Sequence, residues 1–253
     1  MPSFTVLTKK ITEAPRIDFG DLFNESVAVF KKVWFQGFLL QLITIGLSIP
    51  IIIFNVYTSL NLDLDPSSQE FVKGILNNEI SMDQFGLLMV VYYVLVFIMG
   101  VVSTLLSFGF FRVIRQMDEG QPFEISNFFY FFNVTRIKKS LLLILANIAV
   151  VILALLMCVL PVFYVMIPLL FVAPIYAYNE NLSVAEVFKS SFQLGHKKWG
   201  ITFAITILNV VTLYILILFT CGLGSLFFGC FLQMPVYVLY KKIISFESTL
   251  IQH

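Results

Sequence analysis

Charged residues are scarce in this 253-residue sequence: Asp, Glu, Lys and Arg make up 12% of it, against about 25% in soluble domains. Hydrophobic residues make up 59%, so the 16 basic and 15 acidic residues cannot provide the polar surface of a soluble fold. The net charge of +1 also excludes a strongly basic nucleic-acid binder. The composition therefore predicts an integral membrane protein whose first partner is the phospholipid bilayer.

Cysteine and histidine are also few, which argues against a metal centre. Cys158, Cys221 and Cys230 lie in apolar stretches at unrelated spacings, which is typical of small buried side chains. The two histidines, His196 and His253, lie in different segments, whereas metal sites need clustered ligands. No phosphate-binding loop, nucleophile elbow or metalloprotease motif is present. We therefore predict no cofactor, no metal, no catalytic residue and no enzymatic activity.

Long apolar runs are abundant, and they predict an all-α polytopic bundle of about six membrane spans. The runs cover residues 35–57, 86–111, 141–160, 162–178, 199–219 and 223–240. The third and fourth come from one charge-free stretch, 141–178, which is too long for one ordinary span and just sufficient for two. Pro161 lies at its midpoint, where a hairpin needs a helix break. We expect the hairpin rather than a single long span.

The distribution of Lys and Arg predicts the orientation. Fifteen of the sixteen fall on one side of a six-span arrangement, and only Lys73, in the acidic segment 58–84, falls on the other. The fifteen are Lys9, Lys10, Arg16, Lys31, Lys32, Arg112, Arg115, Arg136, Lys138, Lys139, Lys189, Lys197, Lys198, Lys241 and Lys242. Because basic residues stay in the cytoplasm, both termini are expected there and 58–84 is expected to be an outer loop.

Three cytoplasmic segments with helical apolar spacing suggest an internal repeat within a single domain, 1–253. They cover 18–34, 122–139 and 183–198, after an N-terminal tail at 1–17, and each precedes a pair of spans. A shift of 165 residues aligns the first with the third, so that Trp34 meets Trp199, the chain's two tryptophans. We read three units of amphipathic helix plus transmembrane hairpin, although the middle copy lacks the Trp.

The ends of the first and third segments are predicted to anchor the chain at the membrane interface. The candidate anchors are Trp34, Trp199, Lys31, Lys32, Lys197 and Lys198. Two interpretations stay open: the amphipathic helices lie against lipid headgroups, or they pack on the underside of the bundle. Ser183 and Glu186 have the spacing of a capping box, which would start the third helix.

An amphipathic helix that leads through Lys-Lys and Trp into an apolar span resembles a known bacterial family. Residues 182–194, LSVAEVFKSSFQL, and the following Trp199 carry most of the likeness. They are similar to poorly characterised six-span inner-membrane proteins related to the membrane domain found beside glycerophosphodiester phosphodiesterases. The resemblance implies a bacterial cytoplasmic membrane and no catalytic residues. Some members carry the label carotene monooxygenase, which two histidines cannot support, because carotenoid oxygenases hold iron with four.

Neutral polar residues and prolines are the other candidates inside the spans. The polar ones are Gln36, Gln41, Asn55, Asn147, Asn209 and Gln233, which hydrogen bonds between helices would explain. The prolines are Pro50, Pro161, Pro168, Pro174 and Pro235, and three of them crowd the short fourth span. Broken helices line substrate sites in some transporters, but kinks that neighbouring helices satisfy are a sufficient explanation. The fourth span is therefore predicted to be shielded from lipid on at least one face.

These features predict a non-enzymatic membrane protein that acts as a subunit or scaffold of a larger assembly with protein partners. The alternative is a small-molecule or lipid transporter or lipid-handling protein. An intramembrane enzyme is a third possibility, weakened by the scarcity of titratable residues at membrane depth.

Overall fold

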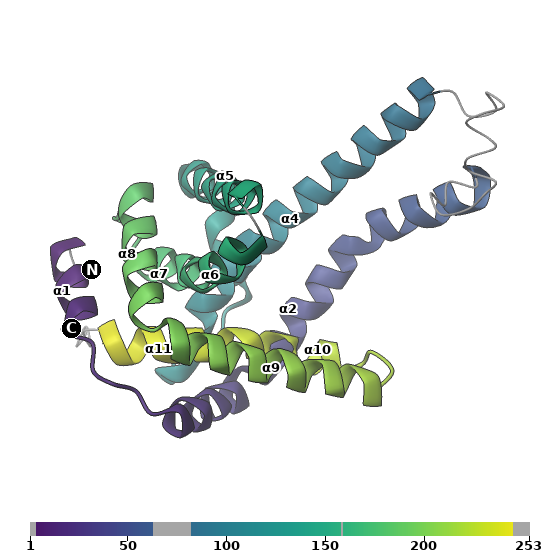
Figure 1. Ribbon diagram of the computed structural model, residues 1–253. Helices are drawn as coiled ribbons and strands as arrows, with labels where there is room; N and C mark the ends of the chain where they lie inside the picture. The colour runs from purple at the N-terminus through teal and green to yellow at the C-terminus, as the bar shows by residue number, and fades with distance from the viewer. Residues whose placement is uncertain (1–3, 63–81, 158, 245–253) are drawn as a thin grey trace. The chain divides into compact units, whose positions relative to one another are not determined.

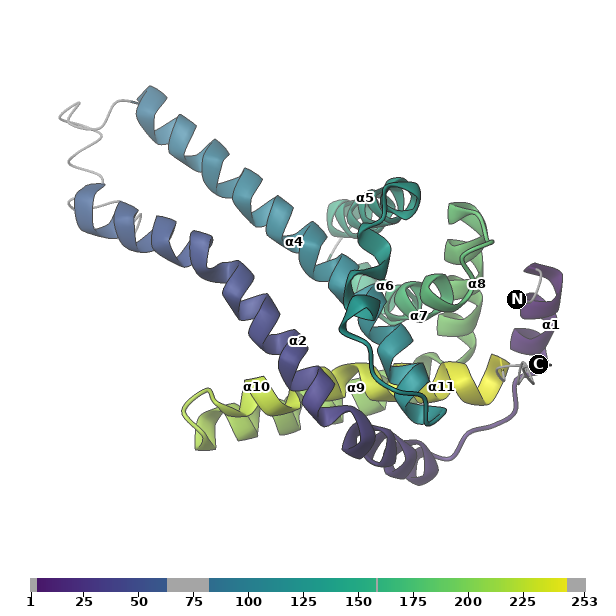
Figure 2. The same cartoon turned by 180° about the vertical axis from the view of Figure 1, so that it is seen from behind.

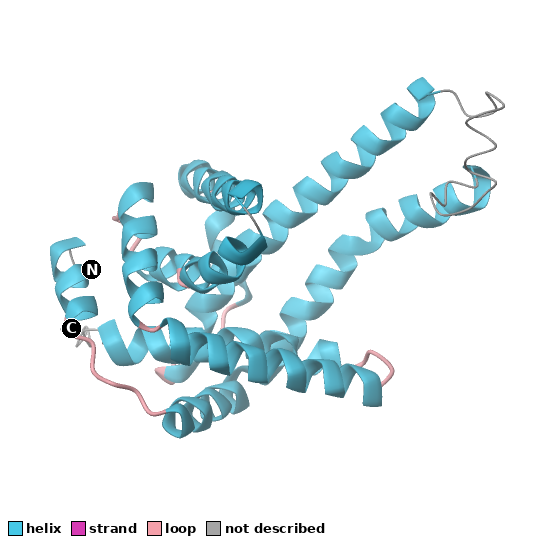
Figure 3. Ribbon diagram, in the orientation of Figure 1, coloured by secondary structure: helices cyan, strands magenta, loops and turns pink. Residues whose placement is uncertain are grey.

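The computed structural model describes residues 4–62, 82–157 and 159–244, and every secondary-structure element in these ranges is helical (Figure 3). Six of the helical stretches are long and apolar enough to cross a membrane, which confirms the predicted all-α polytopic class. The contacts fall into two compact units. The single domain expected at 1–253 stays a prediction. Unit 1 comprises residues 1–41 and 105–253, and unit 2 comprises residues 42–104.

Helix α2 (Phe19–Leu62) begins in unit 1 and ends in unit 2, whereas α4 (Met82–Asp118) begins in unit 2 and ends in unit 1. The other elements of unit 1 follow in chain order (Figure 1). They are α1 (Phe4–Thr12), η1 (Ile125–Phe132), α5 (Val134–Met157), α6 (Val159–Leu170), α7 (Val172–Tyr178), α8 (Val184–Lys197), α9 (Trp199–Phe219), α10 (Gly224–Phe228), η2 (Gly229–Gln233) and α11 (Met234–Ile244).

The predicted hairpin in 141–178 is present, but its break lies before Pro161 rather than on it. Helix α5 ends at Met157 and α6 begins at Val159, and the two helices pack against each other. Pro161 lies in the first turn of α6, where amide groups form no hydrogen bond within the helix, so the absence of an amide hydrogen breaks no helical bond.

The fourth span is not one helix over 162–178 but two, because α6 stops at Leu170 and α7 starts at Val172. The Phe171 amide bonds to the Pro168 carbonyl in a tightened turn. Pro168 and Pro174 each remove an amide donor from the helical ladder, so the backbone cannot run through as a regular helix. Six of the seven residues of α7 are buried, so the expected shielding of this span is present in unit 1.

The sixth span, Gly224–Ile244, is also interrupted. It consists of α10, the tight 3-10 turn η2, and α11, whose second residue is Pro235. Nine of the eleven residues of α11 are buried. Figure 2 shows α11 and α9 side by side, and the two helices are in contact.

The three predicted amphipathic segments have different structures. The third matches α8, which begins with a complete capping box between Ser183 and Glu186. The first, 18–34, is an amphipathic stretch of α2 that continues into the span without interruption. The middle one, 122–139, is not an α-helix: η1 covers its aromatic run, extended Asn133 follows, and α5 takes the rest. The threefold repeat therefore stays a prediction.

The predicted N-terminal tail, 1–17, contains a helix that the sequence analysis missed. In α1, Leu7 and Ile11 are buried one turn apart, and the helix packs on α8. Helix α8 also packs on α6 and α7. This helix is therefore covered by protein, which favours packing on the bundle over direct lipid contact for the third segment.

Unit 2 is a pair of helical segments, the second part of α2 and the first part of α4. Phe54 and Tyr92 stack between them, with ring centroids 5.9 Å apart. None of the side chains described in 42–56 and 86–104 is buried. Most of the acidic outer loop predicted at 58–84 lies outside the described residues.

Candidate functional site

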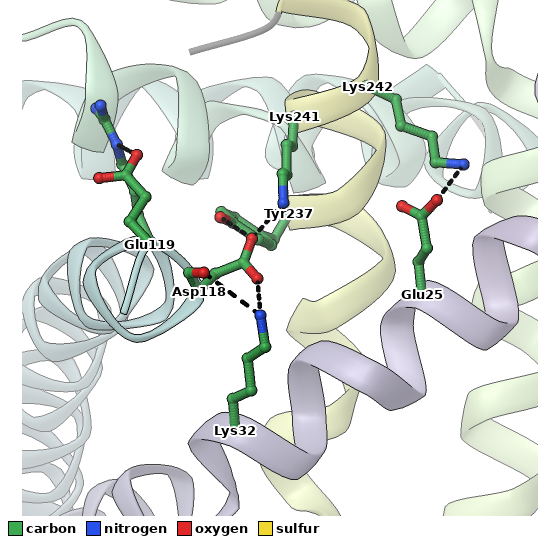
Figure 4. A network of polar contacts seen from close by, with 8 residues as sticks. Glu25, Lys32, Asp118, Glu119, Tyr237, Lys241 and Lys242 are labelled. Carbon is green, nitrogen blue, oxygen red and sulfur yellow. Dashed lines mark hydrogen bonds and ion pairs between the residues drawn. The ribbon is translucent and has the colours of Figure 1, made fainter. Parts of the chain in front are cut away.

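Asp118, the last residue of α4, is the centre of a polar cluster in unit 1 (Figure 4). One carboxylate oxygen accepts a hydrogen bond from Lys32 Nζ at 2.7 Å, and the other accepts from the Tyr237 hydroxyl at 3.0 Å. Lys241 forms a second ion pair with the same carboxylate. A neighbouring pair, Lys242 to Glu25 at 2.7 Å, links α11 to α2 again. The cluster thus joins the first part of α2 and the last residue of α4 to α11.

The position of Asp118 explains why it needs these cations. A carboxylate at a helix C-terminus faces the negative end of the helix dipole, and this side chain is only 4% exposed. Lys32 Nζ also donates to the Asp118 main-chain carbonyl at 3.3 Å, so one lysine satisfies both the side chain and an unpaired helix-end carbonyl. Lys32 and Lys241 are about half exposed, which leaves their own charges hydrated.

Glu180, two residues after α7, is the centre of a second cluster. Arg112 of α4 donates to it at 3.0 Å and Arg136 of α5 at 2.9 Å. The Tyr130 ring of η1 lies between the two guanidinium groups, whose carbons are 3.7 and 4.0 Å from its centroid. Burial and a hydrogen bond to Glu180 raise the pKa of Tyr130, so the phenol stays protonated. Lys139 donates to the Glu180 carbonyl. This cluster joins α4, η1 and α5 to the segment that follows α7.

The predicted anchors Lys197 and Lys198 bind the last residue of α1 and the segment that follows it. Lys197 Nζ donates to the Thr12 carbonyl and Lys198 Nζ donates to the Pro15 carbonyl. Lys198 is 8% exposed, and burial together with the charge of Lys197 lowers its pKa. Both lysines therefore hold the N-terminal segment in place; whether they also reach a lipid interface stays a prediction.

Trp199, another predicted anchor, compensates for the proline in α6. Because Pro168 has no amide hydrogen, the Tyr164 carbonyl one turn earlier lacks its helical donor. Trp199 Nε1 donates to that carbonyl at 3.1 Å, and its ring stacks on Tyr164 with centroids 6.2 Å apart. The Ser191 hydroxyl of α8 donates to the Pro168 carbonyl. The kink is thus satisfied by α8 and α9, as expected for a proline at membrane depth.

Trp34 has a different environment from Trp199, although the two align in the proposed repeat. It is 47% exposed and lies edge-on to its neighbour Phe35, with ring centroids 5.9 Å apart. Lys31, the residue before Lys32, is exposed and has no ion-pair partner among the described residues. Trp34 and Lys31 therefore keep the exposure that an interface anchor needs, while Trp199 has a hydrogen-bonding role.

The remaining candidates do not converge on one site. Asn147 in α5 and Gln233 in η2 each have a buried side-chain oxygen without a hydrogen-bond partner among the described residues, so the expected interhelical bonds are not seen there. Pro161 and Pro235 stand in first turns of helices, and Pro174 is buried within α7. No group of His, Cys, Asp or Glu in the described ranges could hold a metal ion.

A cavity of about 320 Å³ lies in unit 1 between α2, α9, α10 and η2. Its walls are apolar, with Phe30 of α2 stacked on Phe228 and edge-on to Phe231. The polar lining residues are Lys31, Asn209 and Thr212. Asn209 is 3% exposed, and its side-chain oxygen has no partner among the described residues.

Sequence reasoning missed both central carboxylates because it counted basic residues to find the orientation and left the acids unexamined. A usable signal exists: Asp118 and Glu180 are acids within two residues of the end of an apolar helix, on the side that holds the cations.

No family model matches the chain, and neither curated proteins nor solved structures provide a match. The likeness to the six-span bacterial family therefore remains a prediction.

Proposed function

We propose that this integral membrane protein is a non-enzymatic subunit or scaffold of a larger assembly in the bacterial cytoplasmic membrane. The six candidate spans support the membrane location, and the observation that carries the subunit role is the open surface of unit 2. A Cβ added at Gly46, Gly86 or Gly100 would meet no heavy atom within 4 Å. Glycines on transmembrane helices allow another helix to approach closely, so these faces suit a partner span.

The test extracts the protein from its membrane in polymer nanodiscs, without detergent, and measures the particle by native mass spectrometry. We expect a second protein in fixed stoichiometry with the wild type. Gly100→Leu should remove it, because the added side chain blocks close approach, while Val94→Leu at another exposed position of α4 should retain it. A wild-type particle that contains one copy of this chain and only phospholipid would contradict the subunit role.

The proposal includes both termini in the cytoplasm. The distribution of Lys and Arg along the chain supports this orientation, as do the several basic side chains in the Asp118 and Glu180 clusters. Cys221, exposed in the turn after α9, should then react with a membrane-impermeant maleimide added outside. In a Cys158→Ser, Cys221→Ser background, Gln121→Cys, at an exposed position after α4, should react only after permeabilisation. Reaction of Gln121→Cys in intact cells would contradict this orientation.

A transporter or lipid-handling protein is the alternative, and the cavity beside Asn209 is the observation that favours it. The two functions differ in what co-purifies. A protein in fixed stoichiometry favours the subunit role, whereas a retained small molecule that exchanges across the membrane favours the carrier.

A further inference from the structure

The cluster around Glu180 contains more positive than negative charge. Two arginines, Arg112 and Arg136, donate hydrogen bonds to its carboxylate, and Lys139 donates to its main-chain carbonyl. Glu186 also interacts electrostatically with Lys139, and even with this second acid one positive charge remains in excess. The three cations therefore outnumber the acids around them, which favours the binding of a further anion.

The open hydrogen-bond donors of this cluster belong to the two arginines. A guanidinium group carries five N–H donors, of which Arg136 uses only the one on Nε for Glu180, while Arg112 uses Nη1. Among the nitrogens of these two side chains that have no partner in the described ranges, only Arg112 Nε is buried. Both terminal nitrogens of Arg136 and Nη2 of Arg112 therefore reach the surface, and the two side chains are 32% and 27% exposed.

Tyr130 fixes the spacing of the two guanidinium groups. Their carbons lie 3.7 and 4.0 Å from the centroid of its ring, so they are less than about 8 Å apart, a distance that one phosphate can bridge with charge-assisted hydrogen bonds to both groups. Each guanidinium is also bonded to a different oxygen of Glu180. Both groups are thus ordered before a ligand arrives, which lowers the entropic cost of binding it.

The surroundings of these arginines favour a phosphate that is carried by a lipid. Arg136 lies in the first turn of the candidate span Val134–Met157, and Arg112 lies within the last two turns of α4, so both are near the ends of membrane-crossing helices. Val134 itself is 76% exposed, and Phe129 of η1 is 47% exposed. Exposed apolar side chains close in sequence to open cations are typical of a membrane interface.

We infer that Arg112 and Arg136 bind the phosphate of an anionic phospholipid headgroup at the membrane interface of unit 1. The excess positive charge favours an anionic lipid over a zwitterionic one, whose ammonium group would be repelled by the cluster. The inference goes beyond the subunit role and does not depend on it, because a single copy of the chain contains the whole site.

The first experiment measures lipid binding to the purified full-length protein by native mass spectrometry, with phosphatidylglycerol and phosphatidylcholine of identical chains as probes. Arg136→Lys keeps the charge and one nitrogen for Glu180 but removes the planar fork with its open donors. It should therefore weaken phosphatidylglycerol binding about fivefold and leave both phosphatidylcholine binding and the thermal unfolding temperature unchanged. Arg112→Lys should have the same effect. Unchanged phosphatidylglycerol binding in both variants would overturn the proposal.

Lys138→Gln is the matched control for charge alone. Lys138 is exposed on the same helix as Arg136 and has no ion pair among the described residues. The control removes a whole positive charge, whereas Arg136→Lys removes none, so recognition by the arginine fork predicts the larger loss for Arg136→Lys. An equal or larger loss for Lys138→Gln would mean that the lipid responds only to the overall charge of the segment, and would overturn the site.

The second experiment distinguishes a lipid headgroup from a soluble phosphate ester. Glycerol phosphate carries a phosphate without acyl chains, and an excess of it should leave phosphatidylglycerol bound to the wild type. Displacement as effective as that by phosphatidylglycerol itself would overturn the lipid as the occupant. In the membrane, a photoreactive residue at position 134 should capture phosphatidylglycerol, and capture of a peptide instead would overturn the proposal in favour of a protein partner.

Discussion

The fourth and fifth spans of unit 1 are adjacent in the sequence and similarly apolar, yet they differ in both continuity and burial. Helix α9 is one regular helix in which only Thr202, Ile205 and Asn209 are buried. The fourth span is divided at Phe171, and nearly all of α7 is buried. A regular helix satisfies its own backbone and can face lipid, whereas an interrupted one needs donors from its neighbours.

The sixth span follows the same rule. Its interruption at η2 is accompanied by a largely buried α11, and α11 is joined to α2 and α4 by the Asp118 cluster. The two interrupted spans of unit 1 are thus also its most buried ones. Three of the four predictions below test the contacts of these interrupted spans and the fourth tests α8, in order of expected effect.

A close backbone contact to an interrupted span lies at Gly195 of α8. A Cβ added there would lie 2.4 Å from Pro168 Cα, too close for any side chain. Gly195→Ala should therefore lower the free energy of unfolding by about 2–3 kcal/mol, measured by reversible denaturation in mixed micelles. Gly200→Ala in α9 is the control: its Cβ meets nothing within 4 Å, so the variant should gain about 0.5–1 kcal/mol. Equal effects at the two positions would contradict the close packing of α8 on α6.

Asp118 tests the polar side of the sixth span. Asp118→Asn removes the charge that Lys32 and Lys241 share, and we expect a loss of about 1–2 kcal/mol, limited by the exposure of both lysines. The adjacent Glu119→Gln removes only a surface pair with Arg115 one turn away and should cost about 0.3–0.5 kcal/mol. The same denaturation assay compares them, and an Asp118 effect no larger than that of Glu119 would show that the cluster contributes little to stability.

Trp199 and Pro168 form a pair whose coupling can be measured. Trp199→Phe keeps an aromatic ring but removes the donor to the Tyr164 carbonyl, so it should cost about 1 kcal/mol or more. Pro168→Ala restores an amide hydrogen one turn after Tyr164, and in that background Trp199→Phe should cost less. The cycle of single and double variants gives the coupling energy. Additive effects would mean that Trp199 does not compensate for the proline.

Trp34→Phe is the matched control for this cycle. If the repeat gave both tryptophans the same role, the two single substitutions would have equal effects. The exposure of Trp34 predicts a change within about 0.5 kcal/mol.

These contacts also show which features could be predicted from the sequence. Hydrophobic length and charge counting located the six spans, and the capping box of Ser183 and Glu186 located the start of α8, because these signals are local. The prolines indicated that the fourth span needs partners, but only the fold shows that Trp199, 31 residues after Pro168, is the donor. Asp118 pairs with Lys32 and Lys241, which lie far from it in the sequence, and a local sequence pattern cannot predict such long-range ion pairs.

The last prediction concerns the N-terminus of α8, whose capping box couples its stability to pH. Glu186 accepts hydrogen bonds from the Ser183 backbone and hydroxyl, and these bonds lower its pKa below the usual 4.5. A lowered carboxyl pKa means that the stabilisation is complete above 4.5 and is lost as the pH falls through the lower value of the folded state. Hydrogen exchange of the amides of Glu186 and Val187 should therefore show progressively weaker protection as the pH falls below 4.5 and through the lowered pKa of Glu186. Intrinsic exchange rates also change with pH, so each value is compared with that of Glu186→Gln, which can still form a capping box but has no titrating group. The wild type should approach the variant's protection at low pH and exceed it at neutral pH, and a constant ratio across this range would show that the Glu186 charge does not stabilise the start of α8.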